Sequence, residues 1–344
     1  MTDKIKTMKA WQLQGFGIEN LKLITTEIPI PNKNQILVKV GAVSLNFRDK
    51  AIVEKIYLPD IMEFPFIPVS DLAGQIVGIG SDVTRFAIND RVTSHLYGNW
   101  IKGKKHTSTT ALSGLGGPVD GGLAEYILLD EQAAIAAPAT LTNAEAATLP
   151  IAALTAFFAL TKHGQLEKGQ TVLIQGTGGV SLFALQLAKA LGAKVIITSS
   201  SDEKLEKAKA LGADQVINYL KTPNWETEVL RITKGIGVDH IIEVIGGDNF
   251  ERSVEAATIG GQIHVIGFLN GTTSNADLLK ILFKAVRING ILVGNRDAFE
   301  EMNAIIDLHN IKPVIDTTYD FADAISAYKH LERGAFGKLV IKVS

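Results

Sequence analysis

The hydrophobic and polar positions of the chain follow two patterns that meet near residue 142. Before that point, short runs rich in Val and Ile alternate with turn residues, as over 35–40, 73–79 and 91–94. From residue 171 onward, short apolar runs alternate with stretches whose apolar residues have helical spacing. Between the two, Thr142 and Glu145 have capping-box spacing and begin a helical stretch that ends near residue 162. The sequence therefore predicts a β-rich part followed by alternating strands and helices.

In the alternating part, consecutive strands are joined by helices. A helical crossover returns the chain to the same end of the sheet, so such strands are parallel. We therefore expect an α/β fold with a doubly wound parallel sheet. The expected strands cover residues 171–175, 194–198, 215–217, 240–244, 262–266 and 290–293. Later elements are expected to be helices over 298–309 and 321–332 and a closing strand over 338–342.

Composition and charge exclude several classes of protein. The 344 residues include 34 Lys and Arg and 36 Asp and Glu, so no basic excess favours nucleic-acid binding. The chain has no cysteine, which excludes disulfides, thiolate nucleophiles, iron–sulfur clusters and cysteine-ligated zinc. No apolar stretch suits a membrane span, and the first residues lack the apolar core of a secretory signal. We expect a cytoplasmic protein that acts on a small molecule, with no nucleic-acid or membrane partner.

A glycine-rich turn follows the first strand of the alternating part and leads into a helix. Glycine lets the backbone approach a pyrophosphate closely, and free N–H groups at the helix N-terminus stabilise its negative charge. Ser181 replaces the third glycine of the dinucleotide-binding fingerprint. The turn predicts a dinucleotide site, the alternative being an ordinary tight turn. The expected contacts are Gly176, Thr177, Gly178, Gly179 and Val180.

The end of the second strand predicts which dinucleotide binds. An NAD site has an Asp or Glu there for the ribose hydroxyls, whereas this chain has three serines at 199–201. Ser200 and Lys204 suit a 2′-phosphate, and Tyr219 suits the adenosine beside it, so we expect NADPH in preference to NADH. Two structural alternatives stay open: Ser200 and Glu203 have capping-box spacing, and Lys204 is also an ordinary position for a solvated helix lysine.

Further motifs lie along nearly the whole chain. They include Asn46-Phe47-Arg48-Asp49, Pro68-Val69-Ser70-Asp71-Leu72-Ala73-Gly74, Gly121-Gly122-Leu123-Ala124-Glu125-Tyr126 and Leu211-Gly212-Ala213-Asp214. With the glycine turn, this set resembles the medium-chain dehydrogenase/reductase superfamily, and within it the zinc-free quinone oxidoreductase-like subgroup. The resemblance implies a GroES-like catalytic domain over 1–151 and 296–344 and a Rossmann domain over 152–295.

The departures from zinc-binding members of this superfamily concern the metal ligands. Zinc members carry a Cys at the position of Asn46, a His-Glu pair at Ser70 and Asp71, and a second Cys at Ile151. Catalytic zinc needs about three converging side-chain ligands. The resemblance therefore implies that no metal binds here.

The resemblance also assigns roles around the cofactor. It implies that Asn46 lies beside the nicotinamide and that Tyr57 borders the substrate pocket, whereas a second pocket tyrosine of the subgroup corresponds to Ala51, which leaves the substrate open. The further cofactor contacts that it implies are Thr155, backbone groups around Gly267, Phe268, Val293 and Asn295, and Lys338 near the pyrophosphate.

Hydride transfer without a metal requires hydrogen-bond donors for the oxygen of the acceptor. The candidates are the Asn46 amide and the Tyr57 phenol, with Arg48 as a positive charge and Asp71 at the pocket floor. Each has a structural alternative: local backbone bonds for Asn46, an ion pair with Asp49 for Arg48, packing for Tyr57 and a fold-holding role for Asp71. Quinones and enones spread negative charge over a conjugated system, so we expect an NADPH-dependent oxidoreductase that acts on a quinone, enone or related carbonyl.

Two other functions stay open: a zinc-free NAD(P)-dependent alcohol or aldehyde dehydrogenase, and a non-catalytic NADPH-binding redox sensor. The resemblance further implies a homodimer, with a tetramer as the alternative. In it, residues 276–289 and the strand 290–293 pair sheet edges across a two-fold axis, which protects an exposed edge strand.

Overall fold

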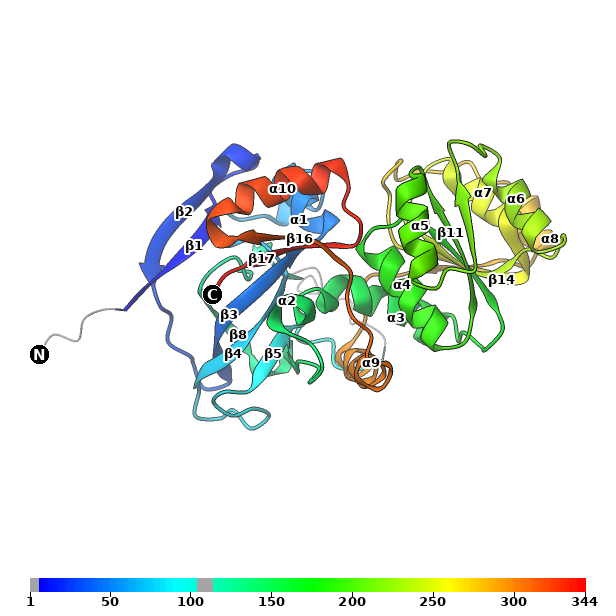
Figure 1. Cartoon of the computed structure of the whole chain (residues 1–344). Helices are drawn as coiled ribbons and strands as arrows, with labels where there is room; N and C mark the ends of the chain where they lie inside the picture. Colours follow the sequence, from blue (N-terminus) through cyan, green and yellow to red (C-terminus); the bar gives the residue numbers. More distant parts are fainter. Residues whose placement is uncertain (1–5, 104–113) are drawn as a thin grey trace, which may run out of the picture. The chain divides into compact units, whose positions relative to one another are not determined.

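The computed structural model describes residues 6–103 and 114–344, which form two compact units (Figure 1). Unit 1 comprises Met1–Ala152 and Asn295–Ser344, and unit 2 comprises Ala153–Gly294. The divisions fall one residue away from the boundaries that the sequence implies. Each unit has its own sheet and its own buried core, so each is described separately.

Unit 2 contains the parallel sheet that the alternating pattern predicts. Its strands are β10 (Thr171–Gln175), β11 (Lys194–Ser199), β12 (Gln215–Asn218), β13 (Val238–Glu243), β14 (Ala257–Val265) and β15 (Arg287–Gly290). They lie in the order β12-β11-β10-β13-β14-β15, and every neighbouring pair is parallel. This order reverses direction between β10 and β13, as in doubly wound dinucleotide-binding folds. The predicted fold class is therefore confirmed.

Helices cover both faces of this sheet. They are α3 (Leu154–Phe157), α4 (Gly179–Ala190), α5 (Asp202–Ala210), α6 (Trp225–Ile232), α7 (Asn249–Ala256) and α8 (Leu278–Phe283). Figure 1 shows α4 and α5 on one side of the strands and α6 and α7 on the other. Because both faces are covered, the central strands are buried throughout, and Leu173 and Ile241 belong to one apolar cluster.

The last strand of unit 2 differs from the prediction. The apolar run 290–293 was expected to be a strand, but β15 covers Arg287–Gly290. Ile291 and Val293 are buried without pairing as a strand, whereas Ile288 of β15 is 46% exposed at the sheet edge. An edge strand buries few side chains, so its sequence lacks the apolar pattern that marks a central strand.

Unit 1 is the predicted β-rich part, joined by the end of the chain. Its strands are β1 (Thr7–Leu13), β2 (Leu21–Glu27), β3 (Gln35–Leu45), β4 (Asp71–Ile79), β5 (Arg91–Ser94), β6 (Gly114–Leu115), β7 (Pro118–Val119), β8 (Tyr126–Asp130), β9 (Ala134–Ala136), β16 (Ile315–Asp320) and β17 (Lys338–Lys342). Strands β1 and β2 form a hairpin, and the main sheet has the order β16-β17-β3-β4-β5-β9, with β8 also paired to β3. The helices of unit 1 are α1 (Phe47–Val53), α2 (Asn143–Ala146), α9 (Arg296–His309) and α10 (Ala324–Arg333).

The closing strand β17 has the bounds that the sequence predicts. It pairs antiparallel with β3, and Leu339 lies opposite Leu45. Helix α10 packs over it (Figure 1) and buries Ala327 and Tyr328 in the core of unit 1. The pairing brings the start of β17 beside the end of β3, although almost the whole chain separates them.

The helical stretch after residue 142 begins as predicted. Thr142 Oγ1 accepts a hydrogen bond from the backbone N of Glu145, and the Glu145 carboxylate accepts one from the backbone N of Thr142. The stretch is interrupted by π-helical segments at Leu149–Ala153 and Phe158–His163. Such segments are wider than an α-helix and often occur at functional sites.

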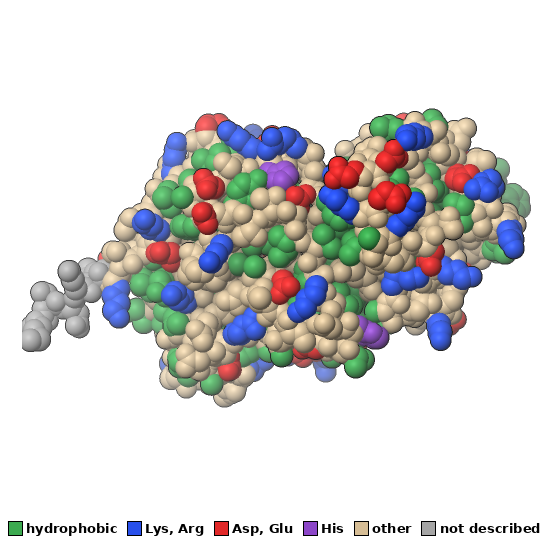
Figure 2. Space-filling view, viewed as in Figure 1, with side chains coloured by type: hydrophobic (Ala, Val, Ile, Leu, Met, Phe, Trp, Pro, Cys, Tyr) green, Lys and Arg blue, Asp and Glu red, His purple; other side chains and the backbone are tan. Residues whose placement is uncertain are grey.

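The surface mixes charges of both signs. On the face shown in Figure 2, Lys and Arg side chains are interspersed with Asp and Glu over both units. In residues 6–103 and 114–344, no helix combines the length and the hydropathy needed to cross a membrane.

Candidate functional site

Asn46 and Asp71 lie at the centre of a buried polar cluster in unit 1. Asn46 stands between β3 and α1, and Asp71 begins β4 opposite Ser44 of β3. Asn46 Nδ2 donates a 2.9 Å hydrogen bond to Asp71 Oδ2, and the backbone N of Ile151 donates to the same oxygen at 3.2 Å. Asp71 Oδ1 is buried and has no hydrogen-bond partner in the described part of the chain. The sheet pairing thus joins two of the expected catalytic residues.

Lys338 supplies the positive charge of this cluster. Its ammonium donates to Asn46 Oδ1 at 2.6 Å and to the carbonyl oxygen of Leu45 at 2.8 Å. Its Nζ also lies 3.9 Å from Asp71 Oδ2. Lys338 is 3% exposed and Asp71 is fully buried, so the ion pair is shielded from water.

Burial and charge act in opposite directions on this pair. Burial raises the pKa of Asp71 to about 7, while the Lys338 ammonium and the bond from Asn46 lower that pKa. Burial lowers the pKa of Lys338, because it disfavours the charged ammonium, and the carboxyls of Asp71 and Asp49 oppose that shift. With a pKa of about 7, the Asp71 carboxyl changes its charge near neutral pH.

Asp49 holds the start of α1 and the start of β4 together. Its Oδ2 accepts from the backbone N of Asn46 at 2.7 Å, and its Oδ1 accepts from the backbone N of Ser70 at 3.2 Å. Burial raises the pKa of Asp49, and Arg48 opposes this. This role of Asp49 was not predicted, although an acidic residue three positions after Asn46 at a helix start is a capping signal.

Arg48 holds a neighbouring segment in place. Its guanidinium donates to Ser70 Oγ at 2.6 Å, to the carbonyl oxygen of Leu115 at 3.0 Å and to that of Gly117. The structural alternative for Arg48 was an ion pair with Asp49, but the hydrogen bonds of the guanidinium go to these three groups instead. Arg48 therefore fixes the 115–117 segment against the loop before β4.

Tyr57 lies close to Arg48 and Tyr97. The Arg48 guanidinium carbon lies 5.8 Å from the centre of the half-buried Tyr57 ring. The two tyrosines share a side-chain hydrogen bond, and burial together with this bond raises the pKa of Tyr97 to about 12. A phenol with this pKa keeps its proton at neutral pH and stays a hydrogen-bond donor.

These residues do not fit a zinc ion. Zinc members of the superfamily that the chain resembles carry their ligands at four positions. In this chain the same positions hold the amide of Asn46, the hydroxyl of Ser70, the carboxyl of Asp71 and the apolar side chain of Ile151. The amide and carboxyl bond to each other and to Lys338. Among the residues described, no three His, Asp or Glu side chains are grouped to hold a metal, and zinc sites need three or four such ligands.

The glycine turn of unit 2 fits a pyrophosphate. Gly176 has a φ of 71°, which favours glycine, and the Ser181 hydroxyl fixes the turn by donating to the carbonyl oxygen of Gln175 at 2.7 Å. Gly178 is the N-cap of α4, and a Cβ built there meets no other atom within 4 Å. The helix N-terminus therefore opens onto free space where an anion can approach. Thr177 is buried at the turn, and Gly179 and Val180 begin the helix.

The residues expected to select the dinucleotide follow two adjacent strands. Ser200 and Lys204 come after β11, and Tyr219 comes directly after β12. Parallel neighbours end at the same edge of the sheet, so the three residues lie at one edge, next to the glycine turn after β10. Ser200 is exposed and Tyr219 is 39% exposed.

The start of α5 corrects one alternative reading of Ser200. Its N-cap is Ser201, whose hydroxyl accepts from the backbone N of Lys204 at 3.3 Å, so the capping box expected at Ser200 and Glu203 is wrong. The nearest acid, Asp202, is bound to the amide of Asn218 and to Lys221. It is therefore already paired within the chain.

The remaining predicted cofactor residues are divided between the units. Thr155 is buried in α3, Gly267 and Phe268 follow β14, and Val293 is buried after β15, all in unit 2. Asn295 belongs to unit 1, where its Oδ1 caps α9 by accepting from the backbone N of Ala298 at 2.9 Å. Lys338 also belongs to unit 1, within the Asn46–Asp71 cluster.

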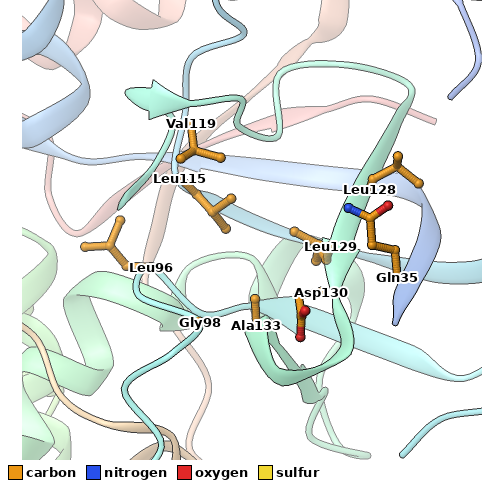
Figure 3. Close-up of a pocket in the computed structure, with 9 residues that line it drawn as sticks. All are labelled: Gln35, Leu96, Gly98, Leu115, Val119, Leu128, Leu129, Asp130 and Ala133. Atoms are coloured by element: carbon orange, nitrogen blue, oxygen red, sulfur yellow. The ribbon is translucent and has the colours of Figure 1, made fainter. Parts of the chain in front are cut away.

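A cavity of about 270 Å³ lies elsewhere in unit 1 (Figure 3). The side chains of Leu96, Leu115 and Val119 line it, with Gln35 and Asp130 as polar members. No predicted site residue lines this cavity. Its lining includes Leu115, whose carbonyl oxygen accepts from Arg48, so the cavity borders the segment that Arg48 holds.

Family models match both parts of the chain. Residues 32–139 match the alcohol dehydrogenase GroES-like domain, and residues 179–308 match the family described as zinc-binding dehydrogenase. The family description mentions zinc, whereas the donor groups described above do not suit that ion.

Whole-length relatives show the same relationship. A zinc-type alcohol dehydrogenase-like protein of Schizosaccharomyces pombe is 41% identical, over 95% of this chain and 96% of its own. The chloroplastic NADPH-dependent alkenal/one oxidoreductase of Arabidopsis thaliana is 28% identical, over 98% of this chain and 80% of its own. The solved structure of the quinone oxidoreductase from Coxiella burnetii is 30% identical and has a TM-score of 0.79, over 98% of this chain and all of its own.

Proposed function

Since the chain belongs to the medium-chain dehydrogenase/reductase superfamily, we propose that it is a zinc-independent, NADPH-dependent oxidoreductase. Its acceptor is a quinone, an enone or a related conjugated carbonyl. The observation that carries the proposal is that Asn46 and Asp71, at two positions where zinc members carry ligands, are hydrogen-bonded to each other and held by Lys338.

Unit 2 carries the residues that would hold the dinucleotide. The backbone N–H groups of the 176–180 turn and the N-terminus of α4 suit its pyrophosphate. Ser200, Lys204 and Tyr219 at the adjacent strand ends suit a 2′-phosphorylated adenosine, and this favours NADPH over NADH. Bound there, NADPH supplies a hydride.

Unit 1 carries the groups that would act on the acceptor. The Asn46 amide and the Tyr57 phenol are neutral donors, which suit an oxygen that becomes negative during reduction. A simple ketone concentrates that charge on one atom and gains more from a Lewis acid, whereas a conjugated acceptor spreads it. Donors of this kind therefore favour conjugated acceptors over simple ketones.

A panel of acceptors with NADPH tests the proposal. We expect NADPH absorbance to fall with naphthoquinone or an enone, at the same rate before and after treatment with a chelator. Loss of turnover with the chelator and its recovery with zinc would overturn the zinc-independent part. Reduction of NADP⁺ by alcohols, with no consumption of NADPH by conjugated acceptors, would favour the alcohol dehydrogenase alternative. Tight NADPH binding with no acceptor reduced would favour the redox sensor.

The choice of dinucleotide is tested by Lys204→Glu. The added negative charge repels the 2′-phosphate, so we expect kcat/KM with NADPH to fall about 100-fold while that with NADH changes little. Lys209→Glu on the same helix is the matched control, because Lys209 pairs with Glu206 in the last turn of α5. Equal losses with both dinucleotides would contradict the preference for NADPH.

We further propose a homodimer joined through unit 2. Strand β15 is one edge of the parallel sheet, and α8, which precedes it in the chain, exposes Leu278, Leu279, Leu282 and Phe283 by 61–77%. Pairing β15 with a second copy would satisfy the edge and cover these side chains.

A further inference from the structure

Lys338 reaches Asn46 because of the pairing between β17 and β3. Leu339 lies opposite Leu45, so Lys338 stands beside the residue that follows β3. Its ammonium is buried at 3% exposure and donates to Asn46 Oδ1 and to the carbonyl oxygen of Leu45. Two of its three N–H groups are therefore directed at the chain around Asn46.

We propose that Lys338 is a positioning residue that fixes the orientation of the Asn46 amide. An ammonium has donors and no acceptor, so the amide oxygen of Asn46 must face it. The amide nitrogen is then turned toward Asp71 Oδ2, 2.9 Å away. In the reverse orientation, the NH₂ group of Asn46 would face the Lys338 ammonium. Both groups are donors, so no hydrogen bond could form between them.

Asp71 by itself does not define this orientation. A neutral carboxyl both donates and accepts, so it can bond to either end of an amide. Burial raises the pKa of Asp71 to about 7, so both forms of the carboxyl occur near neutral pH. Lys338 donates to the same amide oxygen in either case, and the carboxyls of Asp71 and Asp49 favour its charged form.

The consequence for the reaction rests on the proposed function. One N–H of the Asn46 amide donates its hydrogen bond to Asp71. The second N–H of the amide can then donate to an oxygen of the acceptor. An amide held in one orientation presents that N–H without reorganisation when negative charge develops. Lys338 therefore acts through Asn46.

The test compares Lys338→Met with Lys342→Met, an exposed lysine at the other end of the same strand. Protein labelled with ¹⁵N at asparagine, free of dinucleotide, reports the side-chain amide of Asn46, which Asn46→Ala identifies. We expect its two N–H signals to shift in Lys338→Met and to stay in place in Lys342→Met. With NADPH and an accepted substrate, we expect kcat to fall about 10- to 100-fold in Lys338→Met, while KM for NADPH stays within about twofold.

A double variant separates positioning from other roles. If Lys338 acts through Asn46, adding Lys338→Met to Asn46→Ala lowers kcat by no more than about twofold. Should Lys338→Met fail to fold because Asp71 is left unpaired, Lys338→Met/Asp71→Asn removes both charges and is compared with Asp71→Asn alone. The Asn46 signals are again expected to differ between those two proteins.

Two results would overturn the inference. The first is that the Asn46 signals of Lys338→Met match those of the wild type. The equivalent result, where Lys338→Met does not fold, is that the signals of Lys338→Met/Asp71→Asn match those of Asp71→Asn. The other is a raised KM for NADPH at unchanged kcat, which would identify Lys338 as a cofactor contact. Shifted Asn46 signals in a protein that reduces no acceptor would support the positioning role while overturning the proposed function, so the two failures can be told apart.

Discussion

Asn46 and Asp71 are 25 positions apart in the chain, and a 2.9 Å hydrogen bond joins their side chains. The bond couples the charge of a buried carboxyl to an amide that suits the binding of an acceptor oxygen. An ionised carboxylate accepts a stronger hydrogen bond than a neutral carboxyl does. The state of Asp71 is therefore expected to influence the reaction through Asn46.

The first prediction concerns pH. Asp71 has a pKa of about 7, so its carboxylate form is lost as the pH falls through 7, and kcat/KM is expected to fall with it. In Asp71→Asn this step disappears, and kcat/KM at pH 8 is lowered about tenfold, or about 1.4 kcal/mol. Initial rates from pH 5.5 to 9 measure both effects. The exposed Asp82→Asn should keep the wild-type profile, and a step retained in Asp71→Asn would show that another group titrates.

The second prediction concerns the glycine turn. A Cβ at Gly178 meets no protein atom within 4 Å, so Gly178→Val should fold normally, but its side chain occupies space next to the N-terminus of α4. We expect the dissociation constant for NADPH to rise at least about tenfold. Gly15→Val in unit 1 is the control, because a Cβ there comes no closer than 3.6 Å to another side chain, an ordinary van der Waals distance. Fluorescence titration measures binding, and equal affinities in both variants would argue against a pyrophosphate at this turn.

The sequence predicted local features better than long-range ones. The bounds of β17 and the cap at Thr142 follow from a few neighbouring residues. The position of Lys338 beside Asn46 depends on a strand pairing across nearly the whole chain, which no local pattern records. The sheet edge at β15 was misplaced for a different reason, since an exposed strand lacks an apolar signal.

The third prediction concerns acid stability. His240 and His264 are buried and stacked in unit 2, and His240 Nδ1 lies 3.2 Å from His264 Nε2. Burial lowers their pKa values to about 4 and about 3. Below about pH 6.5 the unfolded chain protonates these two imidazoles more readily than the folded chain does. Their contribution to the free energy of unfolding therefore falls as the pH falls from 6.5 to 4, by roughly 2 kcal/mol per histidine at pH 5. The raised pKa of Asp71 contributes in the opposite direction over this range. Thermal unfolding at pH 7 and pH 5, compared between the wild type and a variant that lacks one of the two histidines, measures this contribution.

A substitution checks which histidines are responsible. In His264→Gln we expect the Tm at pH 5 minus the Tm at pH 7 to be more positive than in the wild type, because one of the two buried imidazoles is gone. His309→Gln, at the exposed end of α9, should show the same difference between the two pH values as the wild type. The explanation fails if the difference in Tm between pH 7 and pH 5 is the same in His264→Gln and in the wild type.

The fourth prediction concerns the proposed dimer. Phe283 at the end of α8 is 77% exposed, and an aspartate there would place a charge in the proposed interface. We expect Phe283→Asp to be a monomer by light scattering. Leu308→Asp, a substitution at a similarly exposed position on α9 in unit 1, should leave the dimer intact. A dimer that persists in Phe283→Asp would place the interface elsewhere.

The capping of α5 by Ser201 has a consequence for redesign. Because Ser201 secures the helix start, the hydroxyl of Ser200 has no part in that cap. Substitutions at position 200 can therefore test the proposed contact with the dinucleotide without removing the cap of the helix. In the proposed site, the residue that holds the helix start is thus distinct from the neighbouring residue that would contact the dinucleotide.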